Sequence, residues 1–283
     1  MGRVGASRIL TALLSQETGF QVRRIVSVSG GMQSAICADR VIERYGAASV
    51  TAWFADTLVE DVDLYRFLDD LERRWGLTIT RHTEGRTPLQ VAEDEHVIPN
   101  QKIAPCTHRL KIEPFLAYLK ACPKPATVYL GMAFWEQHRM DAPRKRYEAV
   151  DGVAVDYPSL WKPVDYRPPD EVLRSWGIAV PRAYLEGASH NNCGAACVKQ
   201  GKGDWLRLLR WKPDLFRQYE EWETGMRAKG PPWDGYAFCR DERGGVVRPV
   251  TLRELRETSQ ASPQLRLDLP MLDDAEGCLQ CSI

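Results

Sequence analysis

The stretch SGGMQS at residues 29–34 decides the fold expected for this chain. It follows a short apolar run at residues 25–28 and precedes a segment in which apolar side chains recur at helical spacing. A strand, a glycine-rich turn and a helix N-terminus in this order are suited to cradle an anion. Glycine lets the backbone approach a phosphate closely, and the helix dipole favours negative charge. An ordinary tight turn is the alternative. The candidate phosphate-binding residues are Ser29, Gly30, Gly31 and Ser34.

The totals of the sequence limit the class of protein. The 283 residues suffice for one large domain, or for one domain with a sizeable appendage. The formal net charge is zero, so charge gives no global case for attraction to nucleic acid or membrane. We expect a cytoplasmic protein with no membrane partner, because we find no long apolar run and no secretory signal. Eight cysteines then favour metal or redox chemistry over structural disulfides.

Apolar and amphipathic segments alternate through the first half of the chain. Beyond the opening run, strand candidates lie at residues 49–54, 77–80 and 127–131. Strands that alternate with amphipathic helices predict an α/β fold, with a parallel sheet and helices on both of its faces. Because ligands bind such sheets at the carboxyl ends of the strands, we expect the SGGMQS turn and Asp56 to face one site.

Three regions follow from this pattern. Residues 1–22 are the expected lead-in, and residues 23–155 are the nucleotide-binding α/β core. Residues 156–283 are expected to form a helical and loop-rich extension that carries cysteine pairs and packs on the core. Within it, a helical region is expected from about residue 205 to about residue 229, with an interruption near Pro213.

Further segments follow the turn in a fixed order. They are FADT at residues 54–57, PCTHRLKIEP at 105–114, GMAFWEQHR at 131–139, YPSLW at 157–161 and WGIAVP at 176–181. Together with SGGMQS they resemble the motifs of the PP-loop ATPases, which are N-type ATP pyrophosphatases similar to adenine nucleotide α-hydrolases. Their order resembles the phosphoadenosine phosphosulfate (PAPS) reductase-like branch. The resemblance covers roughly residues 25–198 and implies a HUP/Rossmann-like fold.

The chain departs from that family at several positions. Met32 and Gln33 stand where the loop usually has Lys and Asp, and Ala133 stands where arginine is usual. Thr107 replaces the second cysteine of the pair found in iron-sulfur adenylylsulfate (APS) reductases, and no Glu-Cys-Gly-x-His tail is present. These departures weaken the expectation that this chain reduces sulfonucleotides as that family does. The pattern is closer to enzymes that place sulfur on nucleic acids.

The resemblance implies an adenine-nucleotide site that uses ATP and Mg²⁺. Its nucleotide-binding residues would be Ser29, Gly30, Gly31, Ser34, Asp56 and Gly131. Asp56 would hold Mg²⁺ or a ribose hydroxyl, with a helix N-cap as its alternative role. The expected catalytic residues, which position groups and stabilise charge at a phosphoryl group, are Asp56, Lys111, Glu136, Arg139 and Arg144. A surface ion pair is the alternative for Glu136, and a solvated basic turn is the alternative for Arg144.

Two close cysteine pairs are the sharper chemical clue. Cys193 and Cys197 are separated by three residues, and Cys278 and Cys281 are separated by two. Either spacing lets two sulfurs reach one metal or cluster. By resemblance, Cys106 lies in the segment that supplies cluster ligands in related reductases.

Three arrangements of these thiols compete. The favoured one is a [4Fe–4S] cluster held by Cys106, Cys193, Cys197 and one tail cysteine. Structural Zn²⁺ held by the two pairs is the second. In the third, the tail pair Cys278 and Cys281 is a dithiol that delivers electrons or sulfur. Unligated thiols are the alternative to all three.

The expected function is that of an enzyme that cleaves ATP to AMP and pyrophosphate. The cleavage would activate a nucleobase or small molecule, for instance for thiolation. The expected partners are an adenine nucleotide, a tRNA or DNA acceptor and a donor of electrons or sulfur, and a homodimer is one assembly that we consider. One alternative is a PAPS or APS reductase that uses a C-terminal cysteine. The other is a non-catalytic nucleotide- or nucleic-acid-binding module.

Overall fold

A five-stranded parallel sheet organises the first half of the chain. The computed structural model describes residues 22–243 and 245–261, so Cys278 and Cys281 lie outside the described residues. The strand order is β3-β2-β1-β4-β5, and every pairing is parallel. The strands are β1 (Arg23–Ser27), β2 (Val50–Asp56), β3 (Ile79–Thr83), β4 (Ala126–Leu130) and β5 (Val153–Asp156). The predicted α/β fold with a parallel sheet is confirmed, and β5 is a strand that the sequence pattern did not reveal.

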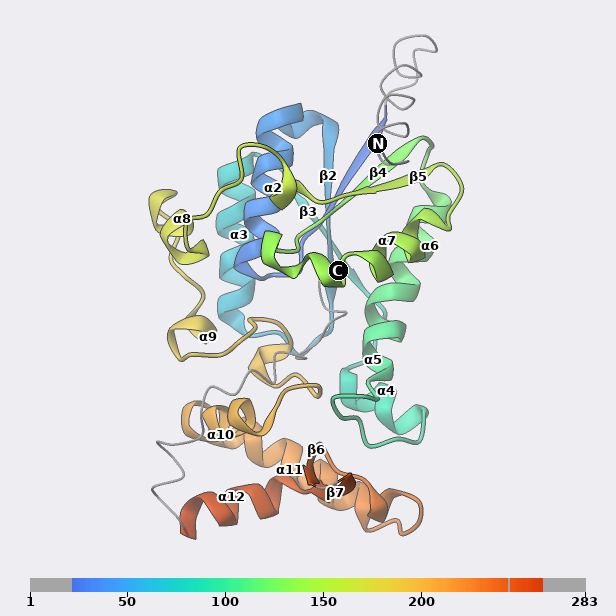
Figure 1. Cartoon of the computed structure of the whole chain (residues 1–283), viewed down its shortest axis with the longest axis vertical. Coiled ribbons are helices and arrows are strands. Elements are labelled where there is room, and N and C mark those ends of the chain that lie inside the picture. The colour runs from blue at the N-terminus through green and yellow to red at the C-terminus, as the bar shows by residue number, and fades with distance from the viewer. Residues whose placement is uncertain (1–21, 244, 262–283) are drawn as a thin grey trace.

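Helices cover both faces of this sheet (Figure 1). One face is covered by α2 (Met32–Tyr45), α3 (Val62–Trp75) and α8 (Pro169–Ser175), and the other by α6 (Glu113–Ala121) and α7 (Asp141–Glu148). The short helices α4 (Pro88–Asp94), α5 (Pro105–Thr107) and α9 (Arg182–Leu185) lie beyond the carboxyl edge of the sheet and pack with the C-terminal helices. Neighbouring strand residues point to opposite faces: Val26 packs in one core cluster with α2, α3 and α8, and Ile25 packs in a second with α6 and α7. Both faces are apolar because both are covered.

Short helical turns lie between the longer helices and the strands. Five are 3₁₀ helices: η1 (Ala47–Ser49), η3 (Phe134–Arg139), η4 (Pro158–Leu160), η5 (Cys193–Ala195) and η6 (Trp233–Gly235). A π-helical turn, η2 (His108–Ile112), joins α5 to α6. Turns of this π type concentrate at functional sites, and this one carries Lys111.

Local sequence signals set the bounds of α3. Its buried face consists of Leu64, Phe67, Leu68, Leu71 and Trp75, which recur at helical spacing. Asp61 caps the helix by accepting a 2.8 Å hydrogen bond from the Asp63 backbone N–H, and Gly76 ends it in the left-handed conformation. The N-cap is therefore Asp61, which leaves the Asp56 carboxylate at the end of β2 for another role.

The C-terminal helices lie beyond the carboxyl edge of the sheet (Figure 1). The elements here are α10 (Lys202–Trp211), α11 (Pro213–Arg227), β6 (Cys239–Arg243), β7 (Val246–Val250) and α12 (Leu252–Ala261), and the two strands pair antiparallel. The helix break before Pro213 matches the expected interruption. Trp205, Phe216 and Phe238 form the centre of a third core cluster, against which Cys106 also packs.

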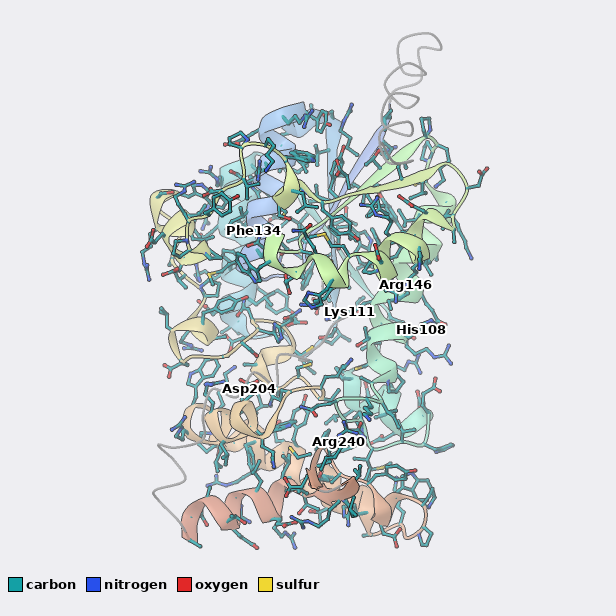
Figure 2. All side chains as sticks on the ribbon, in the orientation of Figure 1. His108, Lys111, Phe134, Arg146, Asp204 and Arg240 are labelled. Atoms are coloured by element: carbon teal, nitrogen blue, oxygen red, sulfur yellow. The ribbon has the colours of Figure 1, made fainter. Side chains whose placement is uncertain are left out.

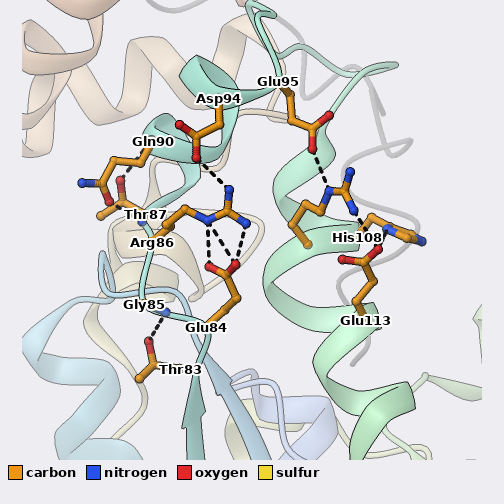
Figure 3. A network of polar contacts seen from close by, with 11 residues as sticks. Thr83, Glu84, Gly85, Arg86, Thr87, Gln90, Asp94, Glu95, His108 and Glu113 are labelled. Carbon is orange, nitrogen blue, oxygen red and sulfur yellow. Dashed lines mark hydrogen bonds and ion pairs between the residues drawn. The ribbon is translucent and has the colours of Figure 1, made fainter.

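A polar network braces the segment that carries Cys106 and Lys111 (Figure 3). Arg109 in η2 donates to Glu95, just after α4, at 2.7 Å and to Glu113 in α6 at 2.9 Å. Upstream, Thr87 and Gln90 form a capping box at the start of α4. These contacts fix how the α5-η2-α6 segment approaches the carboxyl edge.

No helix within the described residues combines the length and apolar character that crossing a membrane requires.

Glu223 is a buried carboxylate that joins three C-terminal elements. It is 1% exposed and accepts hydrogen bonds of 2.7 Å from the backbone N–H groups of Phe238 and Leu252. Burial raises the pKa of Glu223 to about 7, although these two hydrogen bonds act in the opposite direction. The folded state holds the Glu223 proton more tightly than the unfolded chain does. The protonated carboxyl therefore contributes its full stabilisation of the fold below its ordinary pKa, and this contribution is lost as pH rises through the raised pKa.

We expect the Glu223→Gln variant to lose a pH dependence that the natural chain shows. In the natural chain, ionisation of Glu223 should lower the free energy of unfolding by about 3 kcal/mol between about pH 4.5 and pH 8. The amide does not ionise, so the variant should lack this contribution. Urea unfolding at both ends of that range measures the difference, with Glu221→Gln, an exposed position on the same helix, as the matched control. An equal pH slope in the natural chain and Glu223→Gln would contradict the assignment.

Candidate functional site

The turn between β1 and α2 is held closed by a serine hydroxyl. Ser34 Oγ accepts hydrogen bonds from the backbone N–H and the hydroxyl of Ser29, each at 3.1 Å. It donates to the Gly31 carbonyl at 2.8 Å. Gly30 has a φ of 79°, and a Cβ there would lie 2.7 Å from Leu64 Cδ1. The predicted phosphate turn therefore has a defined shape, in which both serines bond within the loop and glycine is required at position 30.

Gly131 brings the end of β4 against this turn. A Cβ on Gly131 would lie 2.3 Å from Ser34 Cα and 2.6 Å from Ser34 Cβ, so only glycine fits. The strand order runs outward from β1 to β2 and β3 on one side, and to β4 and β5 on the other. The turn therefore lies at the topological switch point between β1 and β4, where open α/β sheets bind ligands.

Met32 and Gln33, which replace the usual Lys and Asp, serve the helix itself. Met32 packs against the core cluster on the α2 face of the sheet. Gln33 Nε2 donates to Cys37 Sγ, one helical turn further on, at 3.7 Å. Both side chains therefore make contacts within α2 and its core.

Residues from the second half of the chain cover the turn. Asn191 Nδ2 donates to the Gly30 carbonyl at 2.8 Å. Tyr184 is packed at Gly31, and its burial raises its pKa to about 12, against the effect of hydrogen bonds with the backbone of Met32 and Asn191. The sequence pattern gave neither residue a role at the turn. The two asparagines before Cys193 were the only hint in the sequence of a polar contact here, but they lie far from the turn along the chain.

Asp56 stands at the end of β2 with a fixed orientation. The Tyr65 hydroxyl lies 2.9 Å from both carboxylate oxygens, and the Leu58 backbone N–H donates to Oδ1 at 2.8 Å. Burial and the neighbouring Asp56 charge both raise the pKa of Tyr65, so the tyrosine remains a hydrogen-bond donor. One oriented carboxylate beside a phosphate turn suits Mg²⁺, which takes few protein ligands and shares the nucleotide's phosphates.

A buried polar cluster follows Asp56. Thr57 Oγ1 donates to Glu60 Oε1 at 2.7 Å, and the Cys193 backbone N–H donates to Glu60 Oε2 at 2.5 Å. Burial raises the pKa of Glu60, against the opposing effect of the Lys111 charge. Lys111 is only 4% exposed and lies on the side of the sheet that faces the C-terminal helices (Figure 2). Glu60 was not among the predicted site residues, although it follows the FADT segment closely.

Three of the predicted metal ligands meet beside this cluster. Cys106, Cys193 and Cys197 line one pocket together with Thr57, Pro88, Thr107, Lys111, Ala196, Val198 and Lys199. Within residues 22–243 and 245–261, however, no group of three or more His, Cys, Asp or Glu side chains is arranged to hold a metal ion. The described thiols therefore do not form a metal site by themselves. A cluster or zinc that also uses Cys278 or Cys281 stays a prediction.

The remaining predicted catalytic residues have clear structural contacts. Glu136 accepts a 2.8 Å hydrogen bond from the Ala133 backbone N–H at the start of η3 and forms an ion pair with Arg139. Glu136 thus orients Arg139. Arg144 donates to the Val155 carbonyl at 2.8 Å and pairs with Glu148, which ties α7 to β5. The structure thus brings the turn, Asp56 and Gly131 to the carboxyl edge of the sheet. The Arg144 side chain instead bonds to β5.

Comparison with known proteins gives a likeness among solved structures alone. No protein-family model matches the chain, and no curated protein sequence matches it. Among solved structures, the chain is similar to the crystal structure of phosphoadenylyl-sulfate (PAPS) reductase from Candida auris in a phosphate complex. The identity is 12% and the TM-score 0.43, over 68% of this chain and 95% of that chain. A likeness at this level assigns no function.

We expect Gly131→Ala to destabilise the chain, because the added methyl would overlap backbone and Cβ atoms of Ser34 that cannot move aside. The expected loss is about 1–3 kcal/mol, the usual cost of overpacking. Gly225→Ala in α11 is the matched control, since a Cβ there meets nothing within 4 Å. It should leave the melting temperature unchanged or raise it. Thermal unfolding measures both, and a Gly131→Ala variant as stable as the natural chain would refute the close approach.

Proposed function

We propose that this chain is a PP-loop enzyme that binds an adenine nucleotide at the β1–α2 turn and cleaves ATP to AMP and pyrophosphate. The observation that carries the proposal is the turn itself. It lies at the switch point of a parallel sheet, with Gly131 packed on Ser34 and with Asp56 at the end of the adjacent strand. The ordered motifs that resemble PP-loop enzymes support it.

The proposed reaction begins with attack by a substrate oxygen on the ATP α-phosphate. Pyrophosphate leaves, and a sulfur or nitrogen nucleophile then displaces AMP from the adenylated substrate. Backbone N–H groups of the turn would hold phosphate oxygens. Mg²⁺, held by Asp56, would offset phosphate charge. The protein otherwise contributes positioning, which Tyr65 provides for Asp56 and Glu136 provides for Arg139.

Thiolation is the proposed outcome because thiols lie next to the turn. The segment that binds Gly30 through Asn191 also carries Cys193, whose sulfur is 3.9 Å from Thr57 Oγ1, one residue after Asp56. A nucleobase in tRNA or DNA is the proposed acceptor class. A [4Fe–4S] cluster or Zn²⁺ shared with the tail cysteines remains part of the proposal. Anaerobic purification with metal analysis and a visible spectrum tests for this metal site. Protein that is free of metal would show that the site is wrong.

We expect Ser34→Ala to weaken ATP binding about tenfold, because the turn loses the hydroxyl that closes it. Asp56→Asn should keep ATP binding but lose most pyrophosphate release. Calorimetric titration with ATP and Mg²⁺ measures the affinity, and radiolabelled ATP with tRNA or DNA acceptors measures the release. The matched control is Ser49→Ala, whose hydroxyl bonds to carbonyls at the opposite end of α2. If the natural chain neither binds ATP nor releases pyrophosphate, the proposed function is wrong.

The pocket of three thiols favours one second candidate, reduction of a sulfonucleotide. In that reaction a tail cysteine would attack the sulfur of PAPS or APS and displace the nucleotide phosphate, which would leave an S-sulfonate on the cysteine. A second thiol would then attack the cysteine sulfur, form a disulfide and release sulfite. We expect the double variant Cys278→Ser, Cys281→Ser to abolish sulfite release from these substrates in the presence of a thiol reductant. Sulfite release at the natural rate from the double variant would exclude this mechanism.

A further inference from the structure

We propose that Cys193 and Cys197 form a thiol–disulfide redox pair. Cys197 is the thiol that exchanges with an external disulfide, and Cys193 is the thiol that closes the internal one. The pair gives the chain an oxidoreductase activity toward small peptide disulfides, beyond the nucleotide chemistry proposed above. This activity does not require nucleotide binding, so it and the ATP chemistry can fail separately, and it is the alternative to a metal site on the same thiols.

The two thiols line one pocket, and the backbone between them turns left-handed. Each thiol also affects the pKa of the other. Cys193, Gly194 and Ala195 have φ values of 56°, 63° and 65°. The left-handed conformation costs a non-glycine residue about 1–2 kcal/mol. Such strain persists where the surrounding structure enforces it, and it concentrates at functional sites.

Contacts from two segments, the β2–α3 connection and the α10–α11 junction, enforce this turn. The Cys193 backbone N–H donates to Glu60, and Lys212 Nζ donates to the Gly194 carbonyl at 3.0 Å. A Cβ on Gly194 would lie 2.7 Å from the Val59 carbonyl oxygen, so the turn packs directly on the segment after β2. The fold therefore fixes the backbone turn that places both thiols in the lining of one pocket.

The two thiols differ in access. Cys193 is buried, whereas Cys197 is half-buried and lines two hollows. One is the pocket shared with Cys106. The other is lined by Ala188, Ser189, His190, Asn192, Ala195, Gln200, Asp204, Arg207, Leu208 and Trp211. Cys197 is thus the more accessible of the two thiols, and this difference assigns the two roles.

Gln200 supplies a docking group beside Cys197. Its side chain is 7% exposed, and its Nε2 has no hydrogen-bond partner among the described residues. A buried donor without a partner costs about 1–3 kcal/mol, which a ligand carbonyl or carboxylate would recover. A peptide disulfide such as glutathione disulfide carries both kinds of acceptor.

The proposed exchange balances without any further reactant. Cys197 attacks one sulfur of the external disulfide, which breaks that bond, forms a mixed disulfide and releases one external thiol. Cys193 then attacks the Cys197 sulfur of the mixed disulfide, which forms the Cys193–Cys197 bond and releases the second external thiol. The pair loses two electrons and two protons, and the external disulfide gains them.

Incubation of the full chain in glutathione redox buffers, followed by alkylation and peptide mass spectrometry, tests the pair. We expect a disulfide between Cys193 and Cys197 that forms as the buffer becomes oxidising and reopens on reduction. Cys106→Ser and Cys122→Ser should both retain it, because Cys106 is the competing thiol in the pocket and Cys122 is a half-buried thiol elsewhere. Gln200→Leu should slow its formation about three- to tenfold, the loss expected for one hydrogen bond.

Three results would overturn the proposal. The first is that both thiols stay alkylatable in fully oxidising buffer. The second is that either thiol links to Cys106 or to a tail cysteine instead. The third is that both thiols resist oxidation and alkylation until a chelator is added, which would assign them to a metal site. An unchanged rate in Gln200→Leu would overturn the docking role of Gln200. ATP titration of the same reduced protein reports separately on the nucleotide site.

Discussion

The close approach of Gly131 to Ser34 is the constraint on which the candidate site depends. Because no side chain separates the end of β4 from the first turn of α2, the helix N-terminus sits directly at the switch point of the sheet. Ser34 can then use its hydroxyl to close the turn between Ser29 and Gly31. The shape of the proposed phosphate cradle therefore follows from backbone packing. Side-chain charge at Met32 or Gln33 is not needed to form it.

The second half of the chain completes this edge of the sheet. Asn191 binds the Gly30 carbonyl, the Cys193 backbone binds Glu60, and Lys212 forms an ion pair with Asp61, the cap of α3. These contacts place thiols within the same buried cluster as Lys111. Nucleotide chemistry and sulfur chemistry are thus proposed for adjacent parts of the carboxyl edge of the sheet. The sheet supplies the nucleotide-binding turn, and the C-terminal extension that covers it supplies the thiols.

The departures from the PP-loop motifs have physical explanations in the structure. Met32 and Gln33 bond within their own helix and core, so they replace a charged pair with packing. Arg144, which the motif order placed at the nucleotide, binds a β5 carbonyl. Glu136 and Arg139 form an ion pair. Several side chains in these segments therefore bond within the fold, and their catalytic roles remain proposals.

The sequence by itself determined the parallel sheet, the position of the turn and the break before Pro213. Each depends on neighbours a few residues apart, whose periodicity and backbone preferences are readable in order. Strand β5, of only four residues, was too short to give such a pattern. Only the tertiary structure could bring Asn191 to Gly30 and Cys106 into one pocket with Cys193. Both contacts join segments that are distant in the chain. Packing decides such contacts, and local sequence does not encode it.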